Sequence, residues 1–360
     1  MCQAEDGSQA STGPARTSDE RIVNLGDSIT DGQTYALLVE QALREAGKPV
    51  PRFFGAGIGG DTAAGMRARL ERDVLEHRPT LVMLSCGIND AAHGVKLADY
   101  EADVTAIAER MKAERVKLML LTTTNLRAAH GPAVAKLHEF NAALRRIAAK
   151  YGLTVAEVYD RMEEGRKKEA TLWEADGCHL NFAGYRCMAR AVLDALGQRD
   201  VPVPAELRLG LLPGLVREWK VLACKEPRTL DEKTIGAIHP DGEWRIYTVP
   251  ETKKVGNWWR DQERRRGASI SLAEMFGPAK SFLLVADIPS AQAKDAWLNT
   301  GCELRQVWLN GRRLLGPGAP GRGWHPGSYR IPVRLRAGTN RIVVETGSSF
   351  FVGLTDTKDW

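Results

Sequence analysis

The chain has 360 residues, of which 43% are apolar and 26% charged, as in an ordinary globular protein. This length predicts two domains. The formal net charge of +5 is small and argues against a nucleic-acid partner, which would need basic residues gathered on one face. No apolar run approaches the ~18 residues of a membrane span. Six cysteines are too few for a disulfide-built fold, and they show no C-x-x-C pair or His/Cys metal spacing.

Residues 1–20 are polar and rich in Gly and Ser, without the apolar core of a signal peptide. Such a composition cannot bury enough surface to order itself, so we expect a disordered tether. One interpretation is that Cys2 is the former lipidated residue of an exported bacterial lipoprotein, because a lipid anchor suits such a tether. The other interpretation is an ordinary flexible terminus with a chance cysteine. Export is inferred from these features alone, and the exported protein would be periplasmic, extracellular or lipid-anchored.

Strand-like and helix-like segments alternate from residue 21 to residue 198. The strand candidates are short and apolar, and they are Arg21–Gly26, Pro51–Gly57, Thr80–Gly87, Val116–Thr123 and Thr154–Tyr159. The helical patterns are Tyr35–Ala46, Ala63–Glu76, Ala98–Glu114, Ala133–Lys150 and Phe182–Leu196. This alternation predicts an α/β domain with a five-stranded parallel sheet covered on both faces. In such a sheet, ligands bind beyond the carboxyl ends of the strands.

The pattern changes after Gly197. Residues 199–216 include Val201-Pro202-Val203-Pro204, a stiff extended stretch that predicts a linker. From residue 217 to residue 360, short apolar runs are separated by turn signals such as Asn310-Gly311. The runs are Trp244–Val249, Ser281–Ala286, Glu303–Leu309, Tyr329–Leu335 and Arg341–Glu345. Such runs are typical of an all-β sandwich domain.

The segment Arg21–Gly32, which reads RIVNLGDSITDG, predicts a nucleophile. Ser28 follows the end of the first strand, and a helical pattern opens near Thr34. A helix amino terminus at this place offers free N–H groups to a developing anion. Serine is a poor nucleophile by itself and needs an adjacent base.

The best base is His179, within the sequence WEADGCHLN. Asp176 precedes it by three residues, so a tight turn can bring the carboxylate to one ring nitrogen and fix the tautomer. Cys178 is a second nucleophile candidate, although nothing suggests a base dedicated to it. The remaining histidines lack so close an acidic partner and are interpreted singly as surface or structural residues; they are His77, His93, His130, His138, His239 and His325.

Two further segments end strands where donors to an oxyanion are needed. Phe53–Thr62 reads FFGAGIGGDT, and its glycines let backbone N–H groups approach a ligand. Ser85–Asp90 reads SCGIND and carries the amide of Asn89. Either segment alone is weak evidence, because a Gly-rich loop is usually a turn and a nearby Asn is usually a cap. One sheet edge could hold both together with Ser28 and His179.

In order and spacing, four segments resemble the signature blocks of the SGNH (GDSL-like) hydrolase family. They are Gly26-Asp27-Ser28-Ile29-Thr30, Gly57 in its loop, Gly87-Ile88-Asn89-Asp90 and Asp176-Gly177-Cys178-His179. The resemblance covers about residues 21–197. It implies a flavodoxin-like three-layer α/β/α fold and serine esterase chemistry that needs no metal or other cofactor.

The resemblance also implies a role for each matching residue. Ser28 would be the nucleophile, His179 the general base and later acid, and Asp176 the residue that orients His179. The Ser28 and Gly57 backbone N–H groups and the Asn89 side chain would form the oxyanion hole. Many relatives carry Asn two residues before the glycine of the second block, whereas this chain has Gly55. We expect a looser loop there without lost activity, because the donor is a backbone group.

The second half resembles the galactose-binding-like, jelly-roll sandwiches found beside bacterial carbohydrate-active enzymes. Gln306–Arg312 and Arg336–Val344 carry this less specific resemblance. Trp258, Trp259 and Tyr247 could stack on sugar rings. The alternative, which we favour, is that most of these rings fill the sandwich core or the domain interface.

These features together predict a serine esterase acting on a small acyl ester, with acetyl groups on a carbohydrate as the expected substrate. A lysophospholipase or thioesterase is the alternative within the enzymes. A different class of function is a carbohydrate-binding surface protein with an inactive hydrolase domain. The presence of Ser28, Asn89, Asp176 and His179 together argues against that class.

Overall fold

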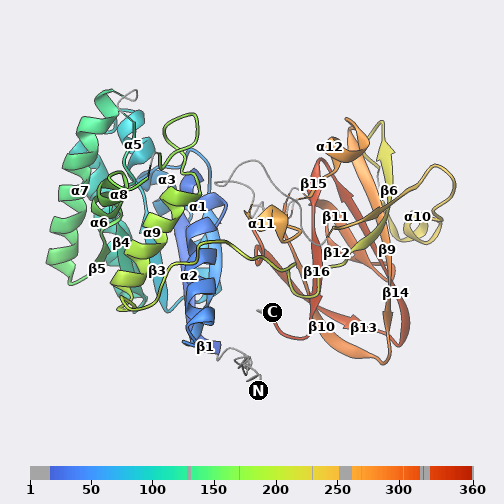
Figure 1. Cartoon of the computed structure of the whole chain (residues 1–360). Coiled ribbons are helices and arrows are strands. Elements are labelled where there is room, and N and C mark those ends of the chain that lie inside the picture. Colours follow the sequence, from blue (N-terminus) through green and yellow to red (C-terminus); the bar gives the residue numbers. More distant parts are fainter. Residues whose placement is uncertain are drawn as a thin grey trace, which may run out of the picture.

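The computed structural model describes residues 17–127, 131–169, 171–228, 230–250, 262–268, 270–302, 304–316, 319 and 325–358. An α/β domain and a β-rich domain lie side by side (Figure 1). Cys2, Trp258 and Trp259, for which lipidation and sugar stacking were each one of two interpretations, lie outside the described residues. No α-helix in the described part of the chain combines the length and apolarity needed to cross a bilayer.

The α/β domain is built on one five-stranded sheet in which every neighbouring pair is parallel. Its strands are β1 (Thr17–Gly26), β2 (Val50–Gly57), β3 (Leu81–Ser85), β4 (Lys117–Leu121) and β5 (Thr154–Ala156). Their order, β2-β1-β3-β4-β5, is that of the flavodoxin-like fold and confirms the predicted fold class. Strand β1 begins at Thr17, where it pairs with Val50, so it includes four residues assigned to the tether.

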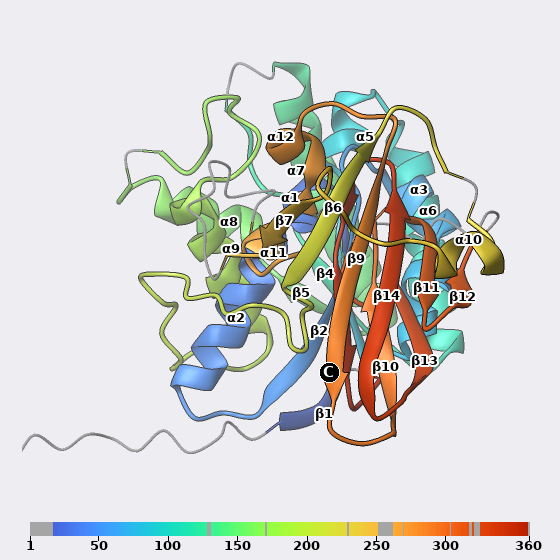
Figure 2. The same cartoon turned by 90° about the vertical axis from the view of Figure 1, so that its right-hand side faces the viewer.

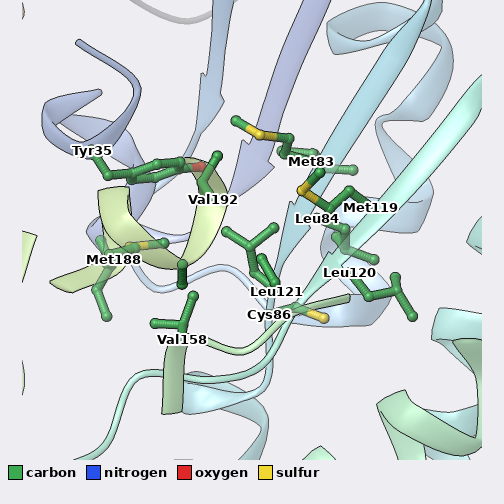
Figure 3. Close-up of a cluster of buried hydrophobic side chains, with 14 of the residues drawn as sticks. Tyr35, Met83, Leu84, Cys86, Met119, Leu120, Leu121, Val158, Met188 and Val192 are labelled. Atoms are coloured by element: carbon green, nitrogen blue, oxygen red, sulfur yellow. The ribbon is translucent and has the colours of Figure 1, made fainter. Parts of the chain in front are cut away.

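Helices cover both faces of this sheet, since all five residues of β3 are buried. The helices α2, α8 and α9 pack together, and α3, α5, α6 and α7 form a second group. The helical segments are α1 (Ser28–Asp31), α2 (Thr34–Glu45), α3 (Ala63–Ala68), α4 (Leu70–Asp73), the 3₁₀ segment η1 (Leu75–His77), α5 (Ile88–Ala92), α6 (Leu97–Ala113), α7 (Pro132–Tyr151), α8 (Val158–Gly165) and α9 (Phe182–Ala195). Figure 3 shows Tyr35 of α2 and Met188 and Val192 of α9 against the sheet, and all three are fully buried.

Two predicted elements differ from the structure. The single helix expected over Ala63–Glu76 is three short segments, because Arg69 leaves helical geometry at φ −110° and ψ 11°. The strand expected over Thr154–Tyr159 ends at Ala156, and α8 follows from Val158. A short apolar run such as this one is compatible with either a strand or a helix.

The β-rich domain is antiparallel throughout its recorded pairings. Its strands are β6 (Glu218–Cys224), β7 (Arg245–Thr248), β8 (Ile270–Ser271), β9 (Ser281–Ser290), β10 (Lys294–Thr300), β11 (Leu304–Leu309), β12 (Arg312–Leu315), β13 (Tyr329–Leu335), β14 (Gly338–Thr346), β15 (Ser349–Phe350) and β16 (Val352–Thr355). Three short helices accompany them, α10 (Glu232–Gly236), α11 (Gln262–Arg265) and α12 (Leu272–Phe276).

The strands form a six-stranded sheet, β12-β11-β14-β9-β6-β7, and a three-stranded sheet, β13-β10-β16 (Figure 2). Apolar side chains from both sheets, such as Phe282 and Leu298, share one buried cluster. Trp219 lies in this cluster and Trp308 in a second one. Tyr247 is half-buried and meets Phe276 edge-on at 6.0 Å between ring centroids.

Residues 199–216 contain no helix or strand and contact both domains. Leu207 joins the core of the α/β domain, while the Leu212 N–H donates to the carbonyl oxygen of Arg266. The side chain of Gln41 in α2 holds the segment, because it donates to the Glu206 carbonyl oxygen and accepts from the Arg208 N–H. The placement of the domain boundary within 199–216 stays a prediction.

Candidate active site

Ser28 begins α1, the single helical turn that follows β1 directly. Asp27 caps this turn, since its carboxylate accepts from the Ile29 N–H at 3.0 Å. The turn packs so closely on the strand end that a Cβ at Gly26 would lie 2.2 Å from the hydroxyl of Thr30. The sharp passage from strand to helix therefore holds Ser28 at the carboxyl edge of the sheet.

His179 reaches Ser28 from the loop before α9. Its Nε2 atom lies 2.9 Å from Ser28 Oγ, and its Nδ1 atom lies 2.6 Å from an oxygen of Asp176. The other oxygen of Asp176 accepts from the Cys178 and His179 N–H groups, each at 2.9 Å. The structure thus joins the three residues in one series of hydrogen bonds, although Ser28 and His179 are 151 positions apart.

The electrostatics of this series suit proton transfer. Burial alone would raise the pKa of Asp176, but hydrogen bonds from the His179 ring and two backbone N–H groups outweigh it and lower the pKa below its ordinary value. An ionised Asp176 accepts from Nδ1, which leaves Nε2 free to take the Ser28 proton. The Asp176 side chain is 47% exposed, so water can reach the pair.

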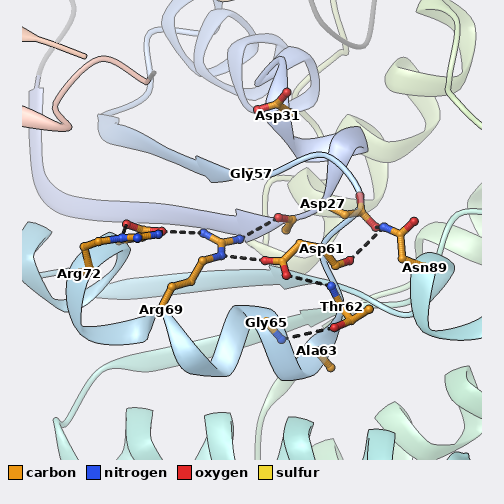
Figure 4. A network of polar contacts seen from close by, with 12 residues as sticks. Asp27, Asp31, Gly57, Asp61, Thr62, Ala63, Gly65, Arg69, Arg72 and Asn89 are labelled. Carbon is orange, nitrogen blue, oxygen red and sulfur yellow. Dashed lines mark hydrogen bonds and ion pairs between the residues drawn. The ribbon is translucent and has the colours of Figure 1, made fainter. Parts of the chain in front are cut away.

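The two predicted oxyanion elements lie at the same sheet edge. Gly57 ends β2 in register with Gly26 at the end of β1. The Asn89 amide, in the first turn of α5, donates to the carbonyl oxygen of Asp61 at 2.9 Å and lies 3.4 Å from a carboxylate oxygen of Asp27 (Figure 4). A Cβ at Gly59 would lie 3.9 Å from the Cβ of Ser28, so the Gly-rich loop runs beside the serine.

Arg69 binds several groups at this edge of the sheet, although it was not among the predicted site residues. Its buried guanidinium donates to Asp61 at 2.7 Å, to Asp73 at 3.2 Å and to the Gly26 carbonyl oxygen at 3.0 Å (Figure 4). The available sequence signal was its position three residues after the buried Met66, on the apolar stripe of the predicted helix. An arginine on such a stripe has to meet partners inside the protein.

The three acidic residues beside the motifs, Asp27, Asp61 and Asp90, accept hydrogen bonds from backbone N–H groups. Asp61 accepts from the Thr62 N–H, and Asp90 accepts from the Ala63 N–H. Burial, opposed by the bond from Ile29 and reinforced by the charges of Asp90 and Asp61, raises the pKa of Asp27 to about 7. This aspartate therefore exchanges its proton near neutral pH.

Cys178, the second nucleophile candidate, lies in an environment that disfavours its reactive form. Burial first, and then the charges of Asp27 and Asp176, raise the pKa of the Cys178 thiol to about 12. A thiol acts as a nucleophile only as the thiolate, so this environment disfavours the second candidate. Cys86 is buried in the core of the α/β domain.

One of the histidines assigned singly to surface or structural roles meets the Gly-rich loop. His325, which precedes β13 in the β-rich domain, is buried, and its Nε2 atom lies 2.8 Å from the carbonyl oxygen of Gly57. A Cβ at Gly55 would lie 2.8 Å from the other ring nitrogen. The space that we expected to loosen the loop at Gly55 is instead filled by this imidazole.

Comparisons with known proteins match the α/β domain. Residues 25–187 match the model of the GDSL-like Lipase/Acylhydrolase family. Esterase TesA of Pseudomonas aeruginosa is 32% identical over 108 residues, which are 28% of this chain and 53% of that protein. Acetylxylan esterase of Geobacillus stearothermophilus is 25% identical over 211 residues, which are 50% of this chain and 95% of that protein. The chain thus spans about half the length of the Pseudomonas relative.

Solved structures similar to the chain include a catalytic mutant of Axe2, an acetylxylan esterase from Geobacillus stearothermophilus. It has a TM-score of 0.47 and 24% identity, and covers 51% of this chain and 96% of that one. The structure of LAE5, an α/β hydrolase enzyme from the metagenome of Lake Arreo, has a TM-score of 0.46 and 22% identity, and covers 52% of this chain and 99% of that one.

Proposed function

We propose that this protein is a serine ester hydrolase that works through an acyl-enzyme. The observation that carries the proposal is the series of hydrogen bonds from Ser28 through His179 to Asp176, with 2.9 Å and 2.6 Å between the heavy atoms. A serine becomes nucleophilic when a base accepts its proton and a third group orients that base. The family of the α/β domain supports the same reaction class.

Ser28 Oγ attacks the ester carbonyl carbon while His179 Nε2 accepts the hydroxyl proton, and Asp176 stabilises the imidazolium that forms. His179 then returns this proton to the departing alcohol. A water molecule activated by the neutral His179 attacks the acyl-enzyme and releases the acid and the free serine. The N–H groups of Ser28 and Gly57 and the amide of Asn89 stabilise the oxyanion of each tetrahedral intermediate.

The proposed substrate is an O-acetylated carbohydrate. Support comes from the likeness to acetylxylan esterase, which extends over 95% of that relative. The β-rich domain beside the site is consistent with a polymeric or oligomeric sugar as the alcohol. This choice of substrate rests on analogy rather than on a contact with sugar.

The test compares the purified full chain with Ser28→Ala on p-nitrophenyl acetate and on acetylated xylo-oligosaccharides, with released acetate as the readout. We expect the wild type to turn over both substrates and Ser28→Ala to be inactive with unchanged circular dichroism. Turnover that persists in folded Ser28→Ala would remove this serine from the mechanism. A wild type that binds acetylated oligosaccharides without releasing acetate would instead support the sugar-binding alternative.

A further inference from the structure

His325 joins the β-rich domain to the Gly-rich loop of the α/β domain. Besides its 2.8 Å contact with the Gly57 carbonyl oxygen, its Nε2 atom lies 3.4 Å from an oxygen of Asp31. Both oxygens accept hydrogen bonds, and a carbonyl oxygen can only accept. The Nε2 atom must therefore carry the proton and donate to Gly57.

Gly55 is shaped to receive this imidazole. A Cβ there would lie 2.8 Å from His325 Nδ1 and 3.0 Å from the amide of Gln33. The backbone of Gly55 does not itself require glycine, because its φ angle is not in the positive range that favours glycine. The ring of His325, which is 5% exposed, thus occupies the space that a side chain at residue 55 would need.

Gly57 needs contacts of this kind to keep one orientation. It has to be glycine, because a Cβ would lie 2.4 Å from the Asp31 N atom, and glycine has the widest range of backbone conformations. The Ile58 N–H donates to the Gly26 carbonyl oxygen at 3.1 Å, which holds one side of the peptide unit between Gly57 and Ile58. His325 holds the carbonyl side of the same unit.

A cavity borders this side of the loop. Its volume is about 230 Å³, and its lining includes Gly57, Gly59, His325 and Ser328. A loop segment beside such a space can move into it unless a contact holds it in place. The contact with His325 is therefore well placed to limit that movement.

We propose that His325 is a positioning residue for the oxyanion hole: by holding the Gly57 carbonyl group it limits rotation about the backbone bonds of Gly57, and so keeps the Gly57 N–H, which belongs to the preceding peptide unit, directed at the ester oxygen. This inference rests on the proposed function. It gives the β-rich domain a part in the active site of the α/β domain, beyond any binding of sugar. The residue does not touch substrate and acts through Gly57.

The experiment measures kcat and KM of the full chain on p-nitrophenyl acetate. For His325→Ala we expect kcat to fall about 10- to 100-fold, as for a misplaced catalytic group, with KM within about threefold. His325→Gln should recover most of the loss, because a glutamine amide can donate to the same carbonyl oxygen. A wild-type kcat in His325→Ala, or no recovery in His325→Gln, would overturn the proposal.

Arg330→Ala is the matched control for domain docking. Arg330 donates to the Glu76 carbonyl oxygen at 3.2 Å, and its guanidinium lies 5.9 Å from the Phe54 ring centroid, so it links the same two domains at a place other than the Gly57 carbonyl group. We expect it to keep a kcat within about twofold of the wild type. An equal loss in Arg330→Ala and His325→Ala would assign the effect to docking and overturn the positioning role.

A double-mutant cycle with Gly55→Ala tests the contact between residue 55 and His325 separately from the effect of either substitution alone. Gly55→Ala should lower kcat in the wild type by displacing the imidazole, and should cost less in His325→Ala, where the ring is gone and the Gln33 amide remains beside the added methyl group. Additive losses would overturn the proposal. Failure of the proposed function looks different, because the wild type itself would then be as inactive as Ser28→Ala.

Discussion

Arg69 donates to the backbone carbonyl oxygen of Gly26 across 3.0 Å, so a guanidinium from the segment after β2 holds the end of the strand that delivers Ser28. The same guanidinium binds Asp61, whose own carbonyl oxygen accepts from the Asn89 amide. The nucleophile strand, the Gly-rich loop and the predicted oxyanion donor are therefore connected through one buried cation. These contacts lie behind the site, so we expect substitutions at residues that do not touch the substrate to change the geometry of the site.

We expect Arg69→Met to lower the free energy of unfolding by about 3–5 kcal/mol, because it leaves the largely buried Asp61 carboxylate without the guanidinium that pairs with it, whereas Asp73 keeps its pair with Arg72. The measurement is urea unfolding followed by the helical circular dichroism signal. Arg44→Met is the control, since Arg44 is half-exposed and pairs with Glu40 on one helix face. That variant should lose less than about 1 kcal/mol. Equal losses in the two variants would contradict the role assigned to Arg69.

Asn89→Ala should lower kcat on p-nitrophenyl acetate by ~10²–10³ and leave KM little changed, because an oxyanion donor acts on the transition state more than on bound substrate. Asn89→Asp is the matched variant, since it keeps the size, removes the donor and adds a negative charge near Asp27. We expect it to be at least as impaired as Asn89→Ala. An unchanged kcat in Asn89→Ala would remove this side chain from the mechanism.

The stability of the protein should depend on pH through Asp27. Because folding raises its pKa from 3.8 to about 7, the folded state binds the proton more tightly than the unfolded state. Its contribution is complete below the ordinary pKa and is lost as pH rises through the folded pKa. Relative to the wild type, Asp27→Asn should therefore gain unfolding free energy, on the order of a few kcal/mol, between about pH 5 and pH 8.

Asp231→Asn is the control for this pH series. Asp231 is an exposed helix cap whose pKa is lowered by hydrogen bonds from the Thr234 backbone and side chain. Its contribution is present above the ordinary pKa and is lost only as pH falls below it, so the difference from wild type should stay flat over the range used for Asp27. A flat difference for Asp27→Asn as well would refute the raised pKa of Asp27.

Cys178 should be dispensable for catalysis. Its pKa of about 12 leaves almost no thiolate at neutral pH, so iodoacetamide should neither label it rapidly nor abolish esterase activity. Cys178→Ala should keep kcat within about threefold of the wild type, the change expected from a small packing defect beside His179. Rapid inactivation by iodoacetamide that is absent in Cys178→Ala would show a reactive thiol at this position.

The sequence by itself predicted the five parallel strands and the longer helices of the α/β domain and pointed to the residues of the candidate site, whereas it predicted only some strands of the β-rich domain. Asp176 and His179 are three positions apart, so their contact is local and can be inferred from one turn. Ser28, Gly57 and Asn89 each follow a strand, and parallel strands bring their carboxyl ends to one edge. Such inferences need only local spacing and the geometry of a sheet.

Tertiary structure alone decided which groups surround those residues. Arg69 interrupts the expected helix between its first two segments and binds Asp61 and Gly26, and neither partner is specified by local periodicity. His325 meets Gly57 across 268 positions, from the other domain. The raised pKa of Asp27 likewise arises from burial near two other carboxylates. Burial and long-range contacts depend on distances in space, which the spacing of residues along the chain does not encode.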